Sequence, residues 1–167
     1  MEKQEIERYL KALEQELSQE GVVGEVCLYG GAVMCLVYEA RPATKDVDAI
    51  FKPADQIRKA AKRVADTYRL GEDWLNDAVK DFVVSHPSKI LLDLPHLKVY
   101  APEPDYLLAM KAMSARVDTT DKDDVLALIR IMKLKTAQEV FAIIEKYYPR
   151  QRIRPASQFF IEELFGQ

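Results

Sequence analysis

Two short features in the first third of the chain carry residue types that are suited to chemistry on phosphates. Gly30 and Gly31 follow an apolar run, and Asp46 and Asp48 come shortly afterwards. Paired glycines let the backbone turn sharply and let a ligand approach closely. The unpartnered amides at the start of a following helix favour a phosphate. Two carboxylates at alternate positions of a strand emerge on one face, and carboxylate oxygens are ligands that Mg²⁺ prefers. The combination predicts phosphoryl or nucleotidyl transfer, which depends mainly on positioning and electrostatics.

Each feature also has a plainer interpretation. A glycine pair between a strand and a helix can serve chain geometry alone, and two aspartates on a strand can mark an edge that faces solvent. However, Val47, Ile50 and Phe51 indicate that this strand is largely buried. Two like charges beside a core are costly unless something compensates them. We therefore predict a site for Mg²⁺ or Mn²⁺ at Asp46 and Asp48.

The surrounding sequence predicts the elements that position these residues. Apolar spacing and turn residues favour helices over 6–17, 32–38, 53–70, 72–80, 102–116, 121–133, 136–148 and 155–165, and strands over 25–29, 46–51, 82–84, 89–94 and 97–101. The last two strands flank Pro95 and suggest a hairpin. The expected fold class is α/β (α+β), with a small mixed sheet flanked by helices over about 22–101 and a helical half over about 102–167. We expect these parts to form a single domain, 1–167.

Composition narrows the functional classes. The formal charge of −3 argues against a generally basic surface for nucleic acid. Cys27 and Cys35 are too few for a disulfide framework and lie in apolar runs, where buried free thiols are expected. The charged N-terminal residues do not resemble a signal peptide, and no apolar stretch reaches the roughly 20 residues that span a bilayer. The expected location is the cytoplasm, without a membrane partner.

Several segments together resemble a known group of enzymes. Residues 28–32 and 44–51 resemble the signature of the polymerase-β-type nucleotidyltransferase superfamily, which is a glycine-rich turn followed by Asp-x-Asp. Residues 105–111 and 121–128 resemble the second and third motifs of the AbiEii-type toxin nucleotidyltransferases and their small uncharacterised relatives. Residues 74–78 also resemble a segment of those relatives. The resemblance extends from about residue 22 to 128.

The resemblance implies the transfer of a nucleoside monophosphate from a nucleoside triphosphate to an acceptor hydroxyl on RNA or protein. It assigns nucleotide binding to Gly30, Gly31, Thr44, Lys45 and Lys111, and Mg²⁺ binding to Asp46 and Asp48. It further implies that Asp121 or Asp124 orients Lys111 or assists the acceptor. Arg41, close to the proposed site, is a further candidate for a contact with the triphosphate.

Two departures from the family pattern motivate other hypotheses. Many members carry a hydroxyl side chain after the first glycine, whereas positions 31 and 32 are Gly and Ala here. Active members often have a third carboxylate, for which Asp93 is the only candidate. A second hypothesis is therefore a binding module that holds nucleotide or a partner without turnover, for example within a toxin–antitoxin pair. A third hypothesis is an interaction protein whose helical half binds a partner.

Overall fold

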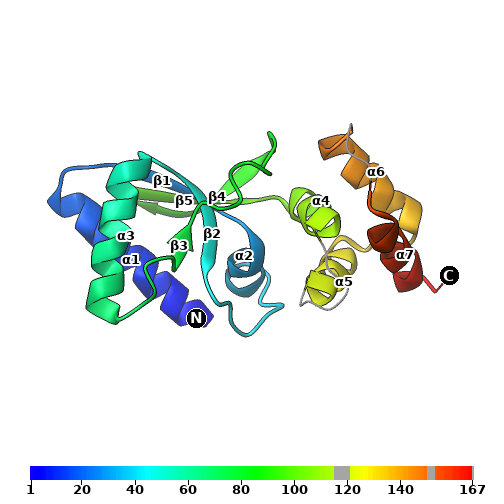
Figure 1. Ribbon diagram of the computed structural model, residues 1–167, viewed down its shortest axis with the longest axis horizontal. Coiled ribbons are helices and arrows are strands. Elements are labelled where there is room, and N and C mark those ends of the chain that lie inside the picture. The colour runs from blue at the N-terminus through cyan, green and yellow to red at the C-terminus, as the bar shows by residue number, and fades with distance from the viewer. Residues whose placement is uncertain (115–120, 150–152, 167) are drawn as a thin grey trace. The chain divides into compact units, whose positions relative to one another are not determined.

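Contacts within the chain divide it into two compact units. The computed structural model describes residues 1–114, 121–149 and 153–166. Unit 1 consists of Met1–Phe82 and Ser88–Pro102, and unit 2 of Val83–Pro87 and Glu103–Gln167. The described residues form seven helices and a five-stranded mixed sheet, so the predicted α/β class is confirmed (Figure 1). No helix in these ranges combines the length and apolar character needed to cross a membrane.

A mixed sheet forms the centre of unit 1. Its strands are β1 (Gly24–Leu28), β2 (Val47–Lys52), β3 (Leu75–Asn76), β4 (Ser88–Leu94) and β5 (Leu97–Pro102), in the order β3-β2-β1-β5-β4. Strand β1 is antiparallel to β2 and parallel to β5. Strand β2 is parallel to β3, and β4 and β5 form the predicted antiparallel hairpin. The turn that leaves the central strand β1 therefore begins directly beside β2.

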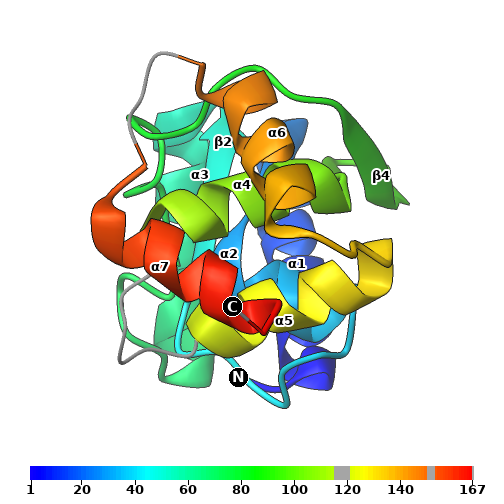
Figure 2. The same cartoon turned by 90° about the vertical axis from the view of Figure 1, so that its right-hand side faces the viewer.

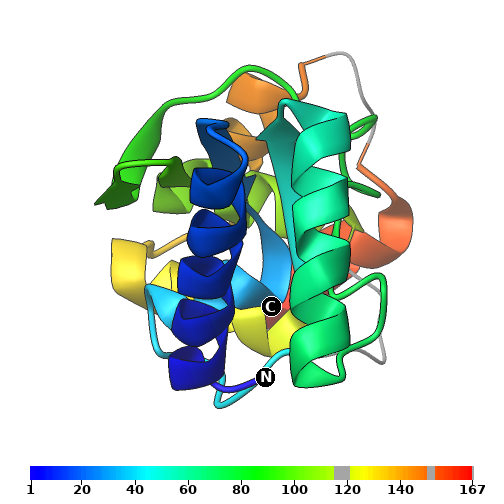
Figure 3. The ribbon, with the colours of Figure 1, turned by 90° about the vertical axis from the view of Figure 1, so that its left-hand side faces the viewer.

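Helices α1 (Lys3–Gln19) and α3 (Ala54–Tyr68) lie side by side on one face of this sheet (Figure 3). The strand residues that face them are apolar and buried: Val26, Leu28, Val47, Ala49, Leu97 and Val99. Gly24 packs between the side chains of Leu17 and Ile57, which come from these two helices. Because side chains alternate along a strand, Asp48 points to the opposite face. Helix α2 (Gly30–Leu36) lies on that side of β2 (Figure 1).

Unit 2 is a group of four helices: α4 (Pro104–Ser114), α5 (Asp121–Met132), α6 (Ala137–Tyr147) and α7 (Pro155–Leu164) (Figure 2). Helix α4 contacts each of the other three and is buried over most of its length. The Tyr106 and Tyr148 hydroxyls lie 3.0 Å apart in this core. The predicted helices over 102–116, 121–133, 136–148 and 155–165 correspond to these elements, although residues 115 and 116 lie outside the described residues.

The predicted helix over 72–80 is wrong. This segment forms turns and the two-residue strand β3. Its conformation is set by distant partners, because the Trp74 indole donates to the Ala61 carbonyl at 2.9 Å and the Val47 amide donates to the Trp74 carbonyl at 2.6 Å. These bonds hold Trp74 against α3 and β2 and so place the short strand β3 at the edge of the sheet.

The predicted strand over 82–84 is also wrong, and β2 begins one residue later than predicted, at Val47. The Phe82 amide closes a turn onto the Val79 carbonyl at 2.9 Å. The Val84 amide donates to the Tyr106 hydroxyl at 3.1 Å rather than to a neighbouring strand. Residues 82–84 are half-buried, and a few positions later the His86 ring stacks on Tyr106 of unit 2 at 4.0 Å.

The start of α6 provides a test of the helical unit. Thr136 is the N-cap of a capping box: its hydroxyl accepts from the Glu139 amide at 3.3 Å, and the Glu139 carboxylate accepts from the Thr136 amide at 2.9 Å. Replacing Thr136 with Ala should lower the free energy of unfolding by about 1 kcal/mol in chemical denaturation. Thr136→Ser keeps the hydroxyl and should retain most of the stability. Equal losses in both variants would contradict the role of the cap.

Candidate functional site

The Asp48 carboxylate lies against the glycine turn that follows β1. The Tyr29 amide donates to the Asp48 carbonyl at 2.8 Å, which extends the pairing of β1 and β2 by one residue. Gly30 has a φ of +61°, and a Cβ at this position would lie 2.9 Å from Asp48 Oδ2. Glycine is therefore favoured here both by the backbone conformation and by the close approach of the carboxylate.

The second glycine makes room for two polar side chains. A Cβ at Gly31 would overlap the Arg41 guanidinium and would lie 2.7 Å from Thr44 Oγ1. Tyr29, the N-cap of α2, provides no side-chain hydrogen bond to the first turn of the helix. A guanidinium and a hydroxyl thus lie next to the second glycine of the turn. The hydroxyl that the sequence lacks at position 31 has a counterpart in Thr44.

The loop that carries Arg41 and Thr44 is held at several points. The Met1 amino group donates to the Thr44 carbonyl at 2.6 Å, and the Thr44 amide donates back to the Met1 carbonyl at 2.9 Å. Thr44 is only 8% exposed, and its hydroxyl donates to the Asp46 carbonyl at 3.1 Å. The Cys35 thiol of α2 donates to the Pro42 carbonyl at 3.8 Å. These bonds fix the loop relative to α1, α2 and the start of β2.

Asp46 and Lys45 lie directly before β2 and line a different hollow. A pocket of about 190 Å³ is bordered by Lys45, Asp46, Asp73 and Trp74, among others. Asp46 is half-buried, whereas Lys45 is exposed. Asp46 and Asp48 flank Val47, whose side chain is buried on the opposite face of the sheet. Asp46 itself lies in a bend before β2, so the predicted strand alternation applies only from Val47 onward.

The donor set is compatible with a divalent cation of the magnesium type. The Asp48 carboxylate supplies hard oxygens, and the absent side chain of Gly30 leaves space beside its Oδ2 that a Cβ would fill. Asp46 lines the hollow described above. Within the described residues, no three His, Cys, Asp or Glu side chains are grouped so that they could hold a metal ion. Mg²⁺ commonly binds through one or two carboxylates and completes its shell with substrate phosphates and water.

The expected third carboxylate is not beside this pair. Asp93 lies on β4, is exposed, and is paired in register with Lys98 of β5. Strands β1 and β5 separate β4 from β2 in the sheet. Since neighbouring strands are about 4.8 Å apart, Asp93 is roughly 14 Å from β2 across the sheet alone. The strand was predicted correctly, but the order of strands excludes Asp93 from the Asp48 site.

The two cysteines do not provide a reactive thiolate near the site. Burial raises the pKa of the Cys27 thiol on β1, and a hydrogen bond with Tyr29 opposes that rise only in part. Burial also raises the pKa of Cys35 on α2, despite the nearby Met1 amino group and Arg41. Both thiols are free and remain protonated at neutral pH. The chemistry of this region therefore depends on oxygen and nitrogen groups.

Unit 2 contains the other three predicted site residues in one cluster. Lys111 Nζ lies 2.7 Å from Asp124 Oδ2 and 3.1 Å from Asp121 Oδ1. The side chains of Lys111 and Asp124 are 7% and 3% exposed, and that of Asp121 is 27% exposed. Asp121 and Asp124 lie three apart on α5 and so share one face of the helix. The structure therefore joins Lys111 to both aspartates, where the sequence left the choice open.

Asp105 is the first residue of the predicted second motif, and its side chain links helices α4 and α6. It accepts hydrogen bonds from the Tyr147 hydroxyl at 2.7 Å, from Lys146 at 3.2 Å and from the Tyr106 amide at 2.8 Å. Burial alone would raise the pKa of Asp105, but these three donors outweigh it and the net pKa is lowered. The carboxylate is ionised at neutral pH and ties the start of α4 to the end of α6.

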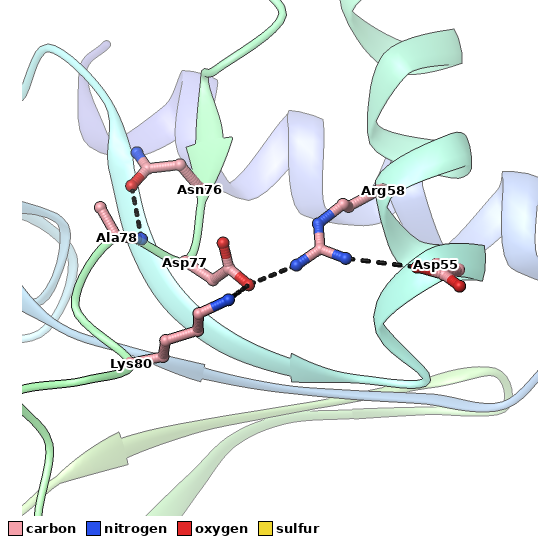
Figure 4. Close-up of polar contacts among 6 residues, drawn as sticks. All are labelled: Asp55, Arg58, Asn76, Asp77, Ala78 and Lys80. Carbon is pink, nitrogen blue, oxygen red and sulfur yellow. Dashed lines mark hydrogen bonds and ion pairs between the residues drawn. The ribbon is translucent and has the colours of Figure 1, made fainter.

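Sequence reasoning did not single out Asn76, which the structure places next to Asp48. Asn76 of β3 is the register partner of Asp48, just as Leu75 is the partner of Val47. Asp77, the next residue, binds Arg58 of α3 at 2.5 Å and lies 3.8 Å from Lys80 (Figure 4). The only signal in the sequence was the resemblance of residues 74–78 to a segment of the small relatives.

Comparisons with protein-family models, with curated proteins and with solved structures found no match for this chain. The nucleotidyltransferase resemblance therefore stays a prediction that depends on the residues described above.

The buried cluster of unit 2 predicts a large effect on stability. Replacing Lys111 with Met removes the ammonium that lies 2.7 Å from the buried Asp124 carboxylate. Removing one partner of a buried ion pair costs about 3–5 kcal/mol, so the free energy of unfolding should fall by an amount of that order.

Lys146→Met is the matched control, because this lysine also pairs with an aspartate but is 62% exposed. Its loss should be below about 1 kcal/mol. Chemical denaturation followed by circular dichroism measures both variants. Similar losses in Lys111→Met and Lys146→Met would contradict a buried, tightly coupled cluster.

Proposed function

We propose that unit 1 binds a nucleoside triphosphate together with Mg²⁺ or Mn²⁺ and transfers the nucleoside monophosphate to an acceptor hydroxyl on RNA or protein. The observation that carries the proposal is the contact between the Gly30 backbone and the Asp48 carboxylate, where a Cβ would lie 2.9 Å from Oδ2. A phosphate chain at the glycine turn would lie next to a carboxylate that binds the cation. Nucleotidyl transfer requires these two groups to be adjacent.

The residues around the turn have complementary roles in this proposal. Gly30 and Gly31 let the phosphate chain approach the backbone, and Asp46 and Asp48 hold the cation. The Arg41 guanidinium, which occupies the space of the missing side chain at position 31, binds a phosphate oxygen. Thr44 and Lys45 belong to the same loop, where Thr44 is buried and Lys45 is exposed.

The reaction balances without a covalent intermediate on the protein. The acceptor oxygen forms a bond to the α-phosphorus, the bond from that phosphorus to the bridging oxygen breaks, and pyrophosphate leaves. The acceptor proton passes to solvent. A bound divalent cation supplies charge stabilisation for the phosphate oxygens. The protein contributes the orientation of the triphosphate at the turn, and Lys111 with Asp121 and Asp124 stays a predicted second contribution from unit 2.

A second candidate function is binding without turnover. It is supported by the position of Asp93, which is separated from β2 by two strands, and by the lack of a three-carboxylate group among the described residues. In that case the protein would hold nucleotide and cation, or a partner such as the other member of a toxin–antitoxin pair, without transferring a group.

Incubation with the four α-labelled triphosphates, Mg²⁺ and bulk RNA or protein tests the first function. We expect wild type to label an acceptor and Asp48→Ala to lose the activity, because the carboxylate at the turn is gone. Asp93→Ala removes the same charge from an exposed site on β4 and should label as well as wild type. Labelling that is equal in all three proteins would contradict the proposal. Calorimetric binding of triphosphate without any labelling would favour the second function.

The proposed role of Gly31 predicts coupling to Arg41. Gly31→Ala should displace the guanidinium that a Cβ would overlap and should weaken triphosphate binding on the order of tenfold, the worth of one hydrogen bond to a charged group. Arg41→Ala should have a similar effect, and the double variant should lose little more, because both changes remove one interaction. Isothermal titration calorimetry measures the affinities, and thermal unfolding checks that each variant is folded. Additive losses would show that Gly31 does not act through Arg41.

A further inference from the structure

We propose that Asn76 supplies a third oxygen to the cation at Asp48, through its side-chain carbonyl. This inference rests on the proposed function, because it assigns a further residue to the same cation. It differs from the sequence prediction, which sought a third group at Asp93. The proposal is carried by the register of β2 and β3, by the contacts that fix β3, and by the hydrogen bonds of the Asn76 amide.

The register places Asn76 beside Asp48 on the same face of the sheet. Val47 pairs with Leu75 and Asp48 with Asn76 in the parallel ladder. Val47 and Leu75 are buried, whereas Asp48 and Asn76 are half-buried on the opposite face. Partners in adjacent strands lie about 4.8 Å apart, which allows both side chains to reach one ion. The Asp48 carboxylate is thus flanked by the Gly30 backbone on the β1 side and by Asn76 on the β3 side.

Contacts on both sides of β3 hold this two-residue strand in place. Before it, the Trp74 carbonyl accepts from the Val47 amide at 2.6 Å, and the Trp74 indole is tied to α3. After it, Asp77 binds Arg58 at 2.5 Å (Figure 4). The guanidinium also lies 5.6 Å from the centre of the Phe51 ring. Such a short strand would otherwise be poorly fixed, so these contacts determine where Asn76 lies.

The Asn76 amide is oriented but not saturated. Its Nδ2 donates to the Asp73 carbonyl at 3.3 Å. Its Oδ1 accepts from the Ala78 amide at 3.2 Å (Figure 4). A carbonyl oxygen has two lone pairs, so Oδ1 retains one for a cation. The two hydrogen bonds limit rotation of the amide and fix the direction of that oxygen in advance, as a precise ligand site requires.

A neutral oxygen at this position has a consequence for binding. A third carboxylate would raise the negative charge beside Asp48 and attract a cation even without nucleotide, whereas an amide adds an oxygen and no charge. With Asp46 and Asp48 as the only proposed carboxylate ligands and the Arg41 guanidinium beside Gly31, the cation should bind weakly to the free protein and more tightly once the triphosphate adds its own oxygens. We infer that Asn76 makes cation binding dependent on nucleotide.

Binding of Mn²⁺ to the full chain, measured by electron paramagnetic resonance, tests this inference without any need for turnover. The titrations use the protein alone and the protein with a triphosphate analogue that cannot be cleaved at the α-phosphorus. Asn76→Ala should weaken Mn²⁺ binding in the presence of the analogue on the order of tenfold. Asn76→Asp should strengthen Mn²⁺ binding to the protein alone by a similar factor.

Two further variants separate this inference from the proposed function. Asp48→Asn should lose Mn²⁺ binding, whereas Asp93→Asn removes a charge from an exposed side chain on β4, which two strands separate from β2, and should bind as wild type does. Wild-type affinity in both Asn76 variants, together with loss in Asp48→Asn, would overturn the role of Asn76 and leave the proposed function intact. If wild type itself binds neither Mn²⁺ nor the analogue, both proposals are overturned. Circular dichroism confirms that each variant is folded.

Discussion

The arrangement of unit 1 depends on the close approach of the Gly30 backbone to the Asp48 carboxylate. The antiparallel pairing of β1 and β2 ends with the hydrogen bond from the Tyr29 amide to the Asp48 carbonyl, so the chain turns into α2 directly above that carboxylate. The positive φ of Gly30 and the 2.9 Å that a Cβ would have to Oδ2 both require a residue without a side chain. In the proposed function, a phosphate at the turn lies next to the Asp48 carboxylate.

The loop before β2 depends on the same constraint. Gly31 leaves space for Arg41 and Thr44. Thr44 forms hydrogen bonds with Met1 through both its backbone amide and its backbone carbonyl. The positive guanidinium and the negative Asp48 carboxylate thus lie next to successive glycines. In the proposed function, the cation binds to the carboxylate and the remaining phosphate oxygens bind to the cationic donor.

Nucleotide binding and nucleotidyl transfer require different groups from the protein. Two carboxylates, an amide and a guanidinium are sufficient groups to hold a nucleotide with its cation. Group transfer also requires stabilisation of the leaving and attacking oxygens, for which the family pattern often uses a further carboxylate. The order of strands keeps Asp93 away from β2, and Lys111 is held by two aspartates within unit 2. Whether the protein transfers the nucleotide or only binds it therefore depends on the position of Asp93 and on the pairing of Lys111.

The sequence by itself determined the class of the fold, most of its helices and strands, and the glycine turn with its aspartate pair. These follow from local periodicity and from residue types whose geometry is set within a few positions. Only the tertiary structure decided that residues 72–80 and 82–84 are not a helix and a strand, that Arg41 and Thr44 occupy the space beside Gly31, and that Asn76 rather than Asp93 lies next to Asp48. The physical reason is that strand order and register arise from hydrogen bonds between distant segments, which local patterns do not encode.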